Sequence, residues 1–349
     1  MKIILAAKSV YPFHPFGGVQ KYVYHYAKYL SKNGVDVEIV APLDNMGKER
    51  TEKFENITYT FLSPSIYRYL EYPIGWLGVH LFSRSLAKYL SRKTFDLLHA
   101  FDMTAFQYLK ANKRRPVITH TFTDNFLTNP ISSGNLMKKV FSGKSKTDEI
   151  KKTKIIITPF SEPSLKRKYW IQYQLKTKPM ADCFHQSDKI FFEADVFAKQ
   201  INEAYRLDAR KSDILPVGVD LHFIQEKLGQ GNMFINREQL GFKEDDIVLM
   251  TVNRLAADKG VDKIVLSLSE LIKVNSKIKL IIIGSGYQEG EIKKIIEEKN
   301  LKEYIRHFKD VPENELYFYY RLADIYLSVF SYPGSSLSTL EAMACSLPI

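Results

Sequence analysis

The chain has 349 residues, of which 45% are apolar and 26% charged, which excludes a disordered or collagen-like polypeptide and leaves room for two globular domains. The two cysteines, Cys183 and Cys345, form no metal-ligand or redox spacing, which favours a reducing compartment. No apolar run approaches the roughly 18 residues of a membrane span, and the run at residues 3–7 is too short for a signal peptide. We therefore expect a cytoplasmic protein.

The net charge of +11 is concentrated in one segment of the chain. Residues 138–178 contain twelve Lys and Arg against three acidic residues, a local net charge of +9, and they also carry Tyr169 and Trp170. This concentration predicts one basic patch and weakens the case for a diffuse nucleic-acid surface. A solvated helical face is an equally good interpretation of such a run.

The first forty residues predict a βαβ unit. A buried strand at residues 2–7 precedes a helix at residues 19–30, whose apolar side chains recur at the helical period, and a strand follows at residues 35–40. Helical runs such as residues 78–91 separate further predicted strands at residues 57–61, 97–100, 117–119, 189–192 and 214–215. This order predicts a doubly wound parallel sheet over the first two-thirds of the chain.

A second α/β pattern begins near Asp246. It predicts strands at residues 247–252, 279–283, 304–308 and 325–329, and helices at residues 263–273, 288–299 and 313–322. With a linker around residues 216–229, we divide the chain into an N-terminal domain, 1–220, and a C-terminal domain, 221–349. Two Rossmann-like domains suggest that ligands bind where the carboxyl edges of both sheets face a central cleft.

The loop after the predicted strand at residues 247–252 carries two cations, Arg254 and Lys259, followed by Gly260. Such loops lie at the carboxyl edge of a parallel sheet, where ligands bind. Two fixed positive charges beside a helix start suit a diphosphate. Taken alone, the segment is equally well explained by two solvated surface charges.

Two glycine pairs lie between a strand and a helix. Gly17-Gly18 precedes the first helix, and Gly284-Ser285-Gly286 follows the strand at residues 279–283. Glycines let a phosphate approach the backbone at a helix N-terminus, although each pair also suits a plain turn. The first strand is not followed by Gly-x-Gly-x-x-Gly and no Walker pattern occurs, which disfavours NAD-dependent and P-loop enzymes.

Polar side chains also follow two neighbouring predicted strands. His120 ends the strand at residues 117–119, and His99 and Asp102 end the strand at residues 97–100. A histidine at a strand's carboxyl end can donate a hydrogen bond or move a proton. One such histidine is more often structural, but two at adjacent strand ends favour a site.

Glu341 lies in a predicted helix after the loop at residues 331–338. A carboxylate among small and apolar residues needs a partner, so it either accepts hydrogen bonds from sugar hydroxyls or forms a capping box with Ser338. The sequence has no Asp-x-Asp at a strand end, no Cys/His ligand spacing and no His-Glu-x-x-His, so nothing in it argues for a metal.

Together these segments resemble glycosyltransferase family 4, a family of retaining enzymes with the GT-B fold of two Rossmann-like domains. The matching segments run in family order and cover nearly the whole chain: Gly17-Gly18-Val19, Leu98-His-Ala-Phe-Asp102, Val117-Ile-Thr-His120, Pro216-Val-Gly-Val-Asp220, Asn253-Arg-Leu-Ala-Ala-Asp-Lys-Gly260, Ile282-Ile-Gly-Ser-Gly286, Ala323-Asp-Ile-Tyr-Leu-Ser328 and Glu341-Ala-Met-Ala-Cys345. Singly they are weak signals, and together they are highly specific.

The resemblance implies a site with three catalytic residues, His120, Arg254 and Lys259. His120 would lie near the transferring sugar, while Arg254 and Lys259 would neutralise the departing diphosphate, so that no metal or other cofactor is required. Glu341 would bind the nucleotide ribose. The remaining donor-side residues are Gly17, Gly18, Gly284, Gly286, Ser335 and Ser336.

The resemblance also implies the partners. The donor would be a UDP- or GDP-linked sugar, and the acceptor a cell-surface glycan or lipid-linked saccharide handled at the inner face of the membrane. The basic segment would suit peripheral contact with an anionic membrane, and no nucleic-acid partner is expected. Acceptor-side candidates are His99, Asp102, Lys166, Arg167 and Lys168.

The chain departs from the family pattern at several positions. Pro333 stands where the family has a second glutamate, Ser335-Ser336 replace its Phe-Gly, and Val217 replaces its usual Asn. The sequence also ends where the family continues with a further strand and helices, so we expect a truncated C-terminal domain. These departures leave an alternative open, a catalytically inactive GT-B protein that binds a nucleotide or a partner subunit.

Overall fold

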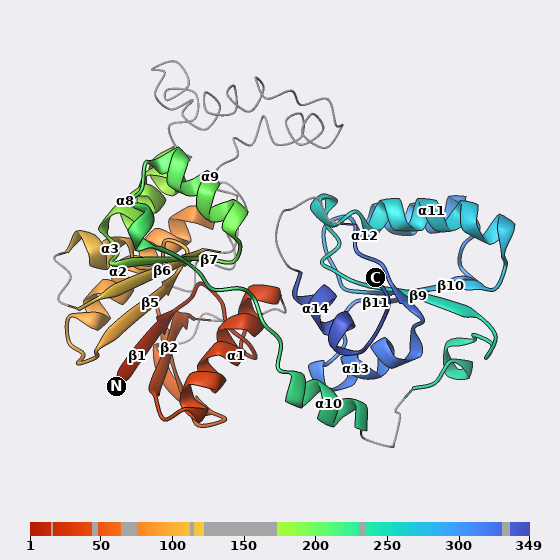
Figure 1. The fold of residues 1–349 in the computed structure, drawn as a ribbon, viewed down its shortest axis with the longest axis horizontal. Coiled ribbons are helices and arrows are strands. Elements are labelled where there is room, and N and C mark those ends of the chain that lie inside the picture. Colours follow the sequence, from red (N-terminus) through yellow and green to blue (C-terminus); the bar gives the residue numbers. More distant parts are fainter. Residues whose placement is uncertain are drawn as a thin grey trace, which may run out of the picture. The chain divides into compact units, whose positions relative to one another are not determined.

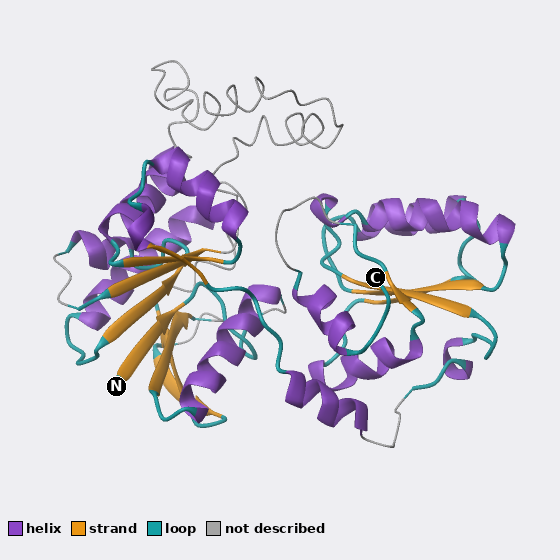
Figure 2. Ribbon diagram, in the orientation of Figure 1, coloured by secondary structure: helices purple, strands orange, loops and turns teal. Residues whose placement is uncertain are grey.

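A computed structural model describes residues 1–14, 17–43, 48–63, 75–111, 115–121, 173–229, 235–329 and 336–349. The chain divides into two units, Met1–Pro216 and Val217–Ile349, each with its own sheet and helices (Figures 1 and 2). The boundary falls at the start of the predicted linker. Most of that linker is helical instead, because Leu221–Gly229 forms α10 and buries Ile224.

The first unit is built on an eight-stranded sheet of order β3-β4-β2-β1-β5-β6-β7-β8. Its strands are β1 (Lys2–Ala6), β2 (Asp36–Pro42), β3 (Arg50–Phe54), β4 (Ile57–Leu62), β5 (Leu97–Phe101), β6 (Val117–Thr121), β7 (Lys189–Phe192) and β8 (Ser212–Ile214). Apart from β3, neighbouring strands pair in parallel, as the βαβ pattern predicted. The strand order reverses between β1 and β5, which marks the place where doubly wound folds bind ligands.

Helices cover both faces of this sheet (Figure 2). They are α1 (Gly18–Lys32), α2 (Gly75–Leu90), α3 (Phe106–Lys110), α8 (Lys178–Gln186) and α9 (Asp195–Tyr205). Successive side chains of β5 point to opposite faces of the sheet. Leu98 and Ala100 therefore pack in the core against α2, α3 and α8. His99 and Phe101 point to the other face, where they meet the aromatic side chains of α1.

The strand β3 was not predicted from the sequence. It pairs antiparallel with β4 through the two-residue turn Glu55-Asn56, in which both residues have positive φ, 46° and 64°. That is the turn that suits a right-twisted hairpin. The strand is polar and only partly buried because it lies at the sheet edge, so hydrophobic alternation could not reveal it.

The second unit has a four-stranded parallel sheet of order β11-β10-β9-β12. Its strands are β9 (Ile247–Val252), β10 (Ile278–Ile283), β11 (Ile305–Phe308) and β12 (Ile325–Tyr326). Its longer helices are α10, α11 (Val261–Val274), α12 (Glu289–Glu298), α13 (Glu313–Leu322) and α14 (Leu337–Ala344). All four strands were predicted, and the strand order reverses between β9 and β12.

Two apolar layers hold this second sheet. Leu249, Leu280 and Ile282 pack against α11 and α12 on one face. Val248 and Met250 pack against α10, α13 and α14 on the other face. Each fully buried aliphatic side chain of this kind contributes about 1.5–3 kcal/mol, so both layers stabilise the edge that carries the β9 loop.

Candidate functional site

The loop after β9 places Arg254 and Lys259 at the carboxyl edge of the second sheet. Arg254 is exposed, and the half-buried Lys259 closes a single 3₁₀ turn, Ala257–Lys259. Gly260 follows with φ +63° as the N-cap of α11, where an added Cβ would come within 2.4 Å of the Val329 carbonyl oxygen. The structure therefore combines two cations with a helix N-terminus, the arrangement that favours a bound anion.

Gly284 and Gly286, at the end of β10, support this loop from the neighbouring strand. A Cβ at Gly284 would lie 2.0 Å from the Asn253 carbonyl oxygen, and one at Gly286 would lie 2.2 Å from that of Leu255. The Leu255 N–H also donates to the Ser285 carbonyl at 2.9 Å. The observed contacts of these glycines are thus with the backbone that carries Arg254. Sequence reasoning gave the pair two interpretations, a donor contact or a plain turn, and did not consider that a glycine after a strand also indicates close packing of two backbones.

Glu341 is buried, with 4% of its surface exposed, on the first turns of α14. Of the two interpretations of Glu341, the capping box with Ser338 is wrong, because the N-cap is Ser336, without a side-chain cap, and Ser338 already lies inside the helix. Instead, the Tyr320 hydroxyl lies 3.2 Å from Glu341 Oε2 and 3.0 Å from the Ser338 carbonyl oxygen. Burial, and then the Glu341 charge, raise the pKa of Tyr320 well above its usual value, so the phenol remains a donor.

The N-terminal end of α14 is tied to the end of β12 by hydroxyl groups. Tyr326 donates to Ser338 Oγ at 2.9 Å, and the Ser336 and Ser338 hydroxyls are 2.8 Å apart. Ser328 and Thr339 form a further pair at 3.2 Å. The helix that carries Ser336 and Glu341 therefore begins beside the reversal of strand order between β9 and β12.

In the first unit, Gly17 is the N-cap of α1 and Gly18 is its first residue. Gly17 is extended and cannot cap with a side chain, and the first turn has no acidic residue. A Cβ at Gly17 would come within 2.4 Å of Gln20 Oε1, whose amide nitrogen donates to Ser9 Oγ at 2.8 Å. The position thus presents a helix N-terminus of the kind that attracts a phosphate.

His99 and His120 are brought together inside the first unit. The strand β6 continues to Thr121, so His120 is its penultimate residue, close to the predicted carboxyl end. Both side chains are almost fully buried, and His99 Nε2 lies 3.3 Å from His120 Nδ1. Tyr22 of α1 packs edge-on to His120 with ring centroids 5.5 Å apart.

Burial sets the charge of this pair. It lowers the pKa of His99 to about 3, and it lowers the pKa of His120 well below the usual value, with the neighbouring His99 as a smaller cause. Both rings are therefore neutral at pH 7. In that state each ring offers one hydrogen-bond donor and one acceptor and carries no charge.

Asp102 lies beside this pair, at the end of β5. Its backbone N–H donates to the His120 carbonyl at 2.8 Å, and its φ is +55°. Lys8, from the loop after β1, forms an ion pair with Asp102 Oδ2 at 3.3 Å. Thr104 donates to the Ala6 carbonyl at 2.9 Å and so fastens the ends of β1 and β5 together. The predicted grouping of His99, Asp102 and His120 is present at the point where the strand order reverses.

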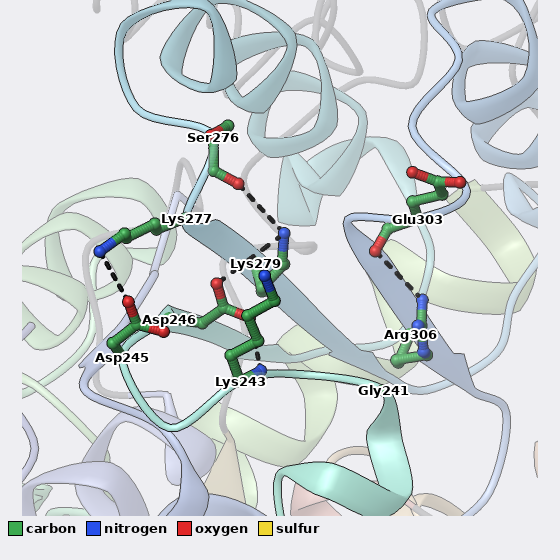
Figure 3. A pocket seen from close by; sticks show the side chains of 9 residues that line it. All are labelled: Gly241, Lys243, Asp245, Asp246, Ser276, Lys277, Lys279, Glu303 and Arg306. Atoms are coloured by element: carbon green, nitrogen blue, oxygen red, sulfur yellow. Dashed lines mark hydrogen bonds and ion pairs between the residues drawn. The ribbon is translucent and has the colours of Figure 1, made fainter.

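The second unit also has a pocket of about 420 Å³ (Figure 3). It lies at the amino ends of β9, β10 and β11, and its lining residues are Gly241, Lys243, Asp245, Asp246, Ser276, Lys277, Lys279, Glu303 and Arg306. Lys277 pairs with Asp245 at 2.6 Å, and Lys279 donates to the Ser276 carbonyl at 3.1 Å. Its charges largely neutralise one another at the edge opposite the Arg254 loop.

Several predicted site residues lie outside the described part of the chain. These are Ser335 and the three basic acceptor-side candidates Lys166, Arg167 and Lys168. Most of the basic segment, including Tyr169 and Trp170, is likewise outside it. Within the described ranges, no helix is both long and apolar enough to cross a membrane. The same ranges contain no group of three or more His, Cys, Asp or Glu side chains placed to hold a metal ion.

Two protein-family models together match nearly the whole chain. The family model "Glycosyltransferase Family 4" matches residues 16–223, and "Glycosyl transferases group 1" matches residues 232–349. The chain belongs to glycosyltransferase family 4. The two matches meet close to the boundary between the structural units.

Curated relatives match this family-4 protein over a limited stretch. An alpha-monoglucosyldiacylglycerol synthase of Acholeplasma laidlawii is 30% identical over 137 residues, 39% of this chain and 34% of that protein. A D-inositol 3-phosphate glycosyltransferase of Segniliparus rotundus is 27% identical over 169 residues, 47% of this chain and 36% of that protein. The matches therefore span little more than a third of these relatives.

Solved structures establish the fold of this family-4 protein. WaaG, a glycosyltransferase involved in lipopolysaccharide biosynthesis, superposes with a TM-score of 0.66 at 15% identity, over 99% of this chain and 80% of that one. Sucrose-phosphate synthase from Thermosynechococcus elongatus gives a TM-score of 0.67 at 14% identity, over 99% and 80%. These neighbours confirm the predicted GT-B fold with its two Rossmann-like units.

Proposed function

We propose that this protein is a retaining glycosyltransferase that moves a sugar from a UDP- or GDP-linked donor to a glycan or lipid-linked acceptor. The observation that carries the proposal is the pair Arg254 and Lys259 beside the N-terminus of α11, at the carboxyl edge of the second sheet. A nucleotide-diphosphate sugar is the substrate whose cleavage needs such a pair of cations.

The chemical reason lies in the leaving group. Breaking the bond between sugar and diphosphate places negative charge on the departing phosphate oxygen. Arg254 and Lys259 would stabilise that charge more strongly in the transition state than in the ground state, without a metal ion. Gly284 and Gly286 would contribute by holding the Arg254 loop through the backbone contacts described above.

Glu341 would bind the nucleotide ribose. A carboxylate held by a phenol is oriented in advance, and it accepts charge-assisted hydrogen bonds from vicinal hydroxyls. The helix start at Ser336 would contribute backbone N–H groups to the phosphates, and the start of α1 at Gly17-Gly18 offers N–H groups of the same kind.

The first unit would serve the transferred sugar and the acceptor. His120 would donate a hydrogen bond to the sugar, and Asp102 with Lys8 would contact acceptor hydroxyls at the ends of β5 and β1. The names of the relatives, an alpha-monoglucosyldiacylglycerol synthase and a D-inositol 3-phosphate glycosyltransferase, support a lipid-linked or phosphorylated acceptor. A membrane-bound acceptor would agree with peripheral contact of the basic segment with anionic lipids at the inner face of the membrane.

The decisive experiment is a transfer assay with a panel of UDP- and GDP-sugars, preceded by thermal-shift measurements with UDP, GDP and ADP. We expect Lys259→Ala to lower kcat by roughly 10²–10³-fold, the range seen when one charge-stabilising group is removed, with the fold intact. The control is Lys273→Ala, an exposed lysine in the last turn of α11 and so at the helix end opposite the proposed anion site, which should keep full activity.

The alternative is an inactive GT-B protein that binds a nucleotide, and Pro333 in place of the family glutamate favours it. The same assay separates the two. Nucleotide binding with neither transfer nor donor hydrolysis across the panel would reject the enzyme and support the binding protein.

A further inference from the structure

We propose that His307 is a positioning residue, whose imidazole fixes the turn after β10 and, through that turn, the loop that carries Arg254. The catalytic consequence rests on the function proposed above, whereas the structural role of His307 does not. His307 is half-buried on β11, in register with Ile282 of β10. The strand β10 separates β11 from β9, so His307 can reach the β9 loop only through the end of β10.

The His307 ring contacts the turn through one short hydrogen bond. Its Nε2 lies 2.8 Å from the Gly284 carbonyl oxygen. A carbonyl oxygen can only accept a hydrogen bond, so Nε2 carries a proton and donates it. The imidazolium ion keeps this N–H, so protonation of the ring leaves the contact in place.

Gly284 is the residue at which this turn most needs an external hold. The pairing of β10 with β11 ends at Ile283 and Phe308, and Gly284 adopts φ +133° just beyond it. A glycine passes easily between backbone conformations, so the peptide groups on either side of it need partners. The Phe308 carbonyl accepts from the Gly284 N–H at 2.8 Å, and His307 donates to the Gly284 carbonyl. The strand β11 therefore holds both peptide groups of this glycine.

The next residue of the turn contacts the β9 loop directly. The Ser285 carbonyl accepts from the Leu255 N–H at 2.9 Å. Rotation of the peptide group between Gly284 and Ser285 would swing this carbonyl away from Leu255. Because the buried Leu255 follows Arg254 in the chain, the backbone of Arg254 depends on the shape that His307 gives to the turn.

A second link joins the same turn to the segment that carries Lys259. The Tyr287 hydroxyl accepts from the Ala257 N–H at 2.9 Å, and Ala257 begins the 3₁₀ turn that ends at Lys259. The Gln288 N–H also donates to the Leu255 carbonyl at 3.1 Å. The turn after β10 is thus bonded to the β9 loop at two places, one beside each cation.

This arrangement gives His307 a role in the reaction without contact with the substrate. It fixes the backbone that carries Arg254 and Lys259 before a donor binds. The charge that these cations stabilise develops on the leaving phosphate only as the bond breaks, so their misplacement costs the transition state more than the bound donor. Loss of the His307 donor should therefore lower kcat and leave the donor KM unchanged.

The direct test is hydrogen–deuterium exchange of the full chain without ligand, measured at the amides of Leu255 and Ala257. His307→Phe fills the space of the ring without a donor. We expect it to speed exchange at both amides about 5-fold, the factor for one net hydrogen bond of about 1 kcal/mol. Exchange at Leu268, which is buried in the middle of α11, corrects for any change in global stability.

Two further variants make the exchange experiment specific. In His307→Gln the side-chain amide can still donate to the Gly284 carbonyl, so we expect wild-type exchange at both amides. His222→Phe replaces an exposed histidine of α10 and should also leave them unchanged. Unchanged exchange in a folded His307→Phe protein, or equal acceleration in His307→Gln, would overturn the proposal.

Activity then tests the catalytic consequence. In the transfer assay, His307→Phe should lower kcat about 5-fold with the donor KM unchanged, and His307→Gln should restore it. Faster exchange at Leu255 with wild-type kcat would show that His307 holds the loop without serving the reaction. The exchange measurement needs neither donor nor turnover, so it remains decisive even if the transferase proposal fails.

Discussion

Gly284→Ala tests whether the end of β10 holds the loop that carries Arg254. Gly284 has φ +133°, a region that side-chain-bearing residues rarely adopt, and its N–H donates to the Phe308 carbonyl at 2.8 Å. A Cβ there would lie 2.0 Å from the Asn253 carbonyl oxygen. The substitution therefore strains its own backbone and also displaces the β9 loop.

The expected loss of stability is the sum of two costs, the strained backbone at position 284 and the displacement of the β9 loop. A non-glycine residue in such a conformation costs about 1–3 kcal/mol. Real Cβ contacts essentially never fall below 3.0 Å, so the Asn253 backbone must shift by about 1 Å, which adds about 1–3 kcal/mol of overpacking. We expect a loss of about 2–6 kcal/mol, a large part of the usual total stability of about 5–15 kcal/mol.

The assay is urea unfolding of the full chain, followed by thermal shift with UDP and GDP. The matched control is Gly290→Ala in the first turn of α12, where an added Cβ meets nothing within 4 Å. Alanine there should be neutral or stabilise the protein by up to about 1 kcal/mol. A Gly284→Ala protein within about 1 kcal/mol of wild type and with unchanged nucleotide binding would refute the proposed support of the loop.

Two further substitutions address buried carboxylates. Tyr320→Phe removes the hydroxyl that contacts Glu341, so we expect a loss of about 1 kcal/mol in unfolding free energy and weaker nucleotide binding by thermal shift; unchanged values would show that Glu341 does not depend on the phenol. Burial would raise the pKa of Glu38, but hydrogen bonds from Tyr89 and Thr60, together with the charges of Lys2 and Lys93, outweigh it and hold that pKa below 4.5. A lowered pKa stabilises the fold above about pH 4.5, and the benefit is lost as the pH falls through the folded-state pKa. In urea titrations, Glu38→Gln should therefore be less stable than wild type at about pH 7, and the difference should shrink in acid; a constant difference would contradict this account.

Periodicity and spacing alone predicted much of this architecture. The parallel strands are short apolar runs with helices between them, and each run can be recognised from the neighbouring residues in the sequence. The Arg254 loop was predicted in the same way, because a strand, a loop with two cations and a helix follow one another without a break. The edge strand β3 was missed because its residues are mostly polar, and only its pairing with β4 identifies it as a strand.

The tertiary structure decided how the side chains pair. His120 was expected near a strand end and lies one residue before the end of β6, but its burial against His99 arises because the sheet sets β5 and β6 side by side. Glu341 was expected either at a ligand or in a capping box, and its observed partner is Tyr320, from another helix. Gly284 and Gly286 were expected either at a phosphate or in a plain turn, and the contacts that the structure gives them are with the backbone of the loop after β9. Each of these contacts joins residues far apart in the chain, so a local sequence pattern carries the residue types of the site but not the distances between them.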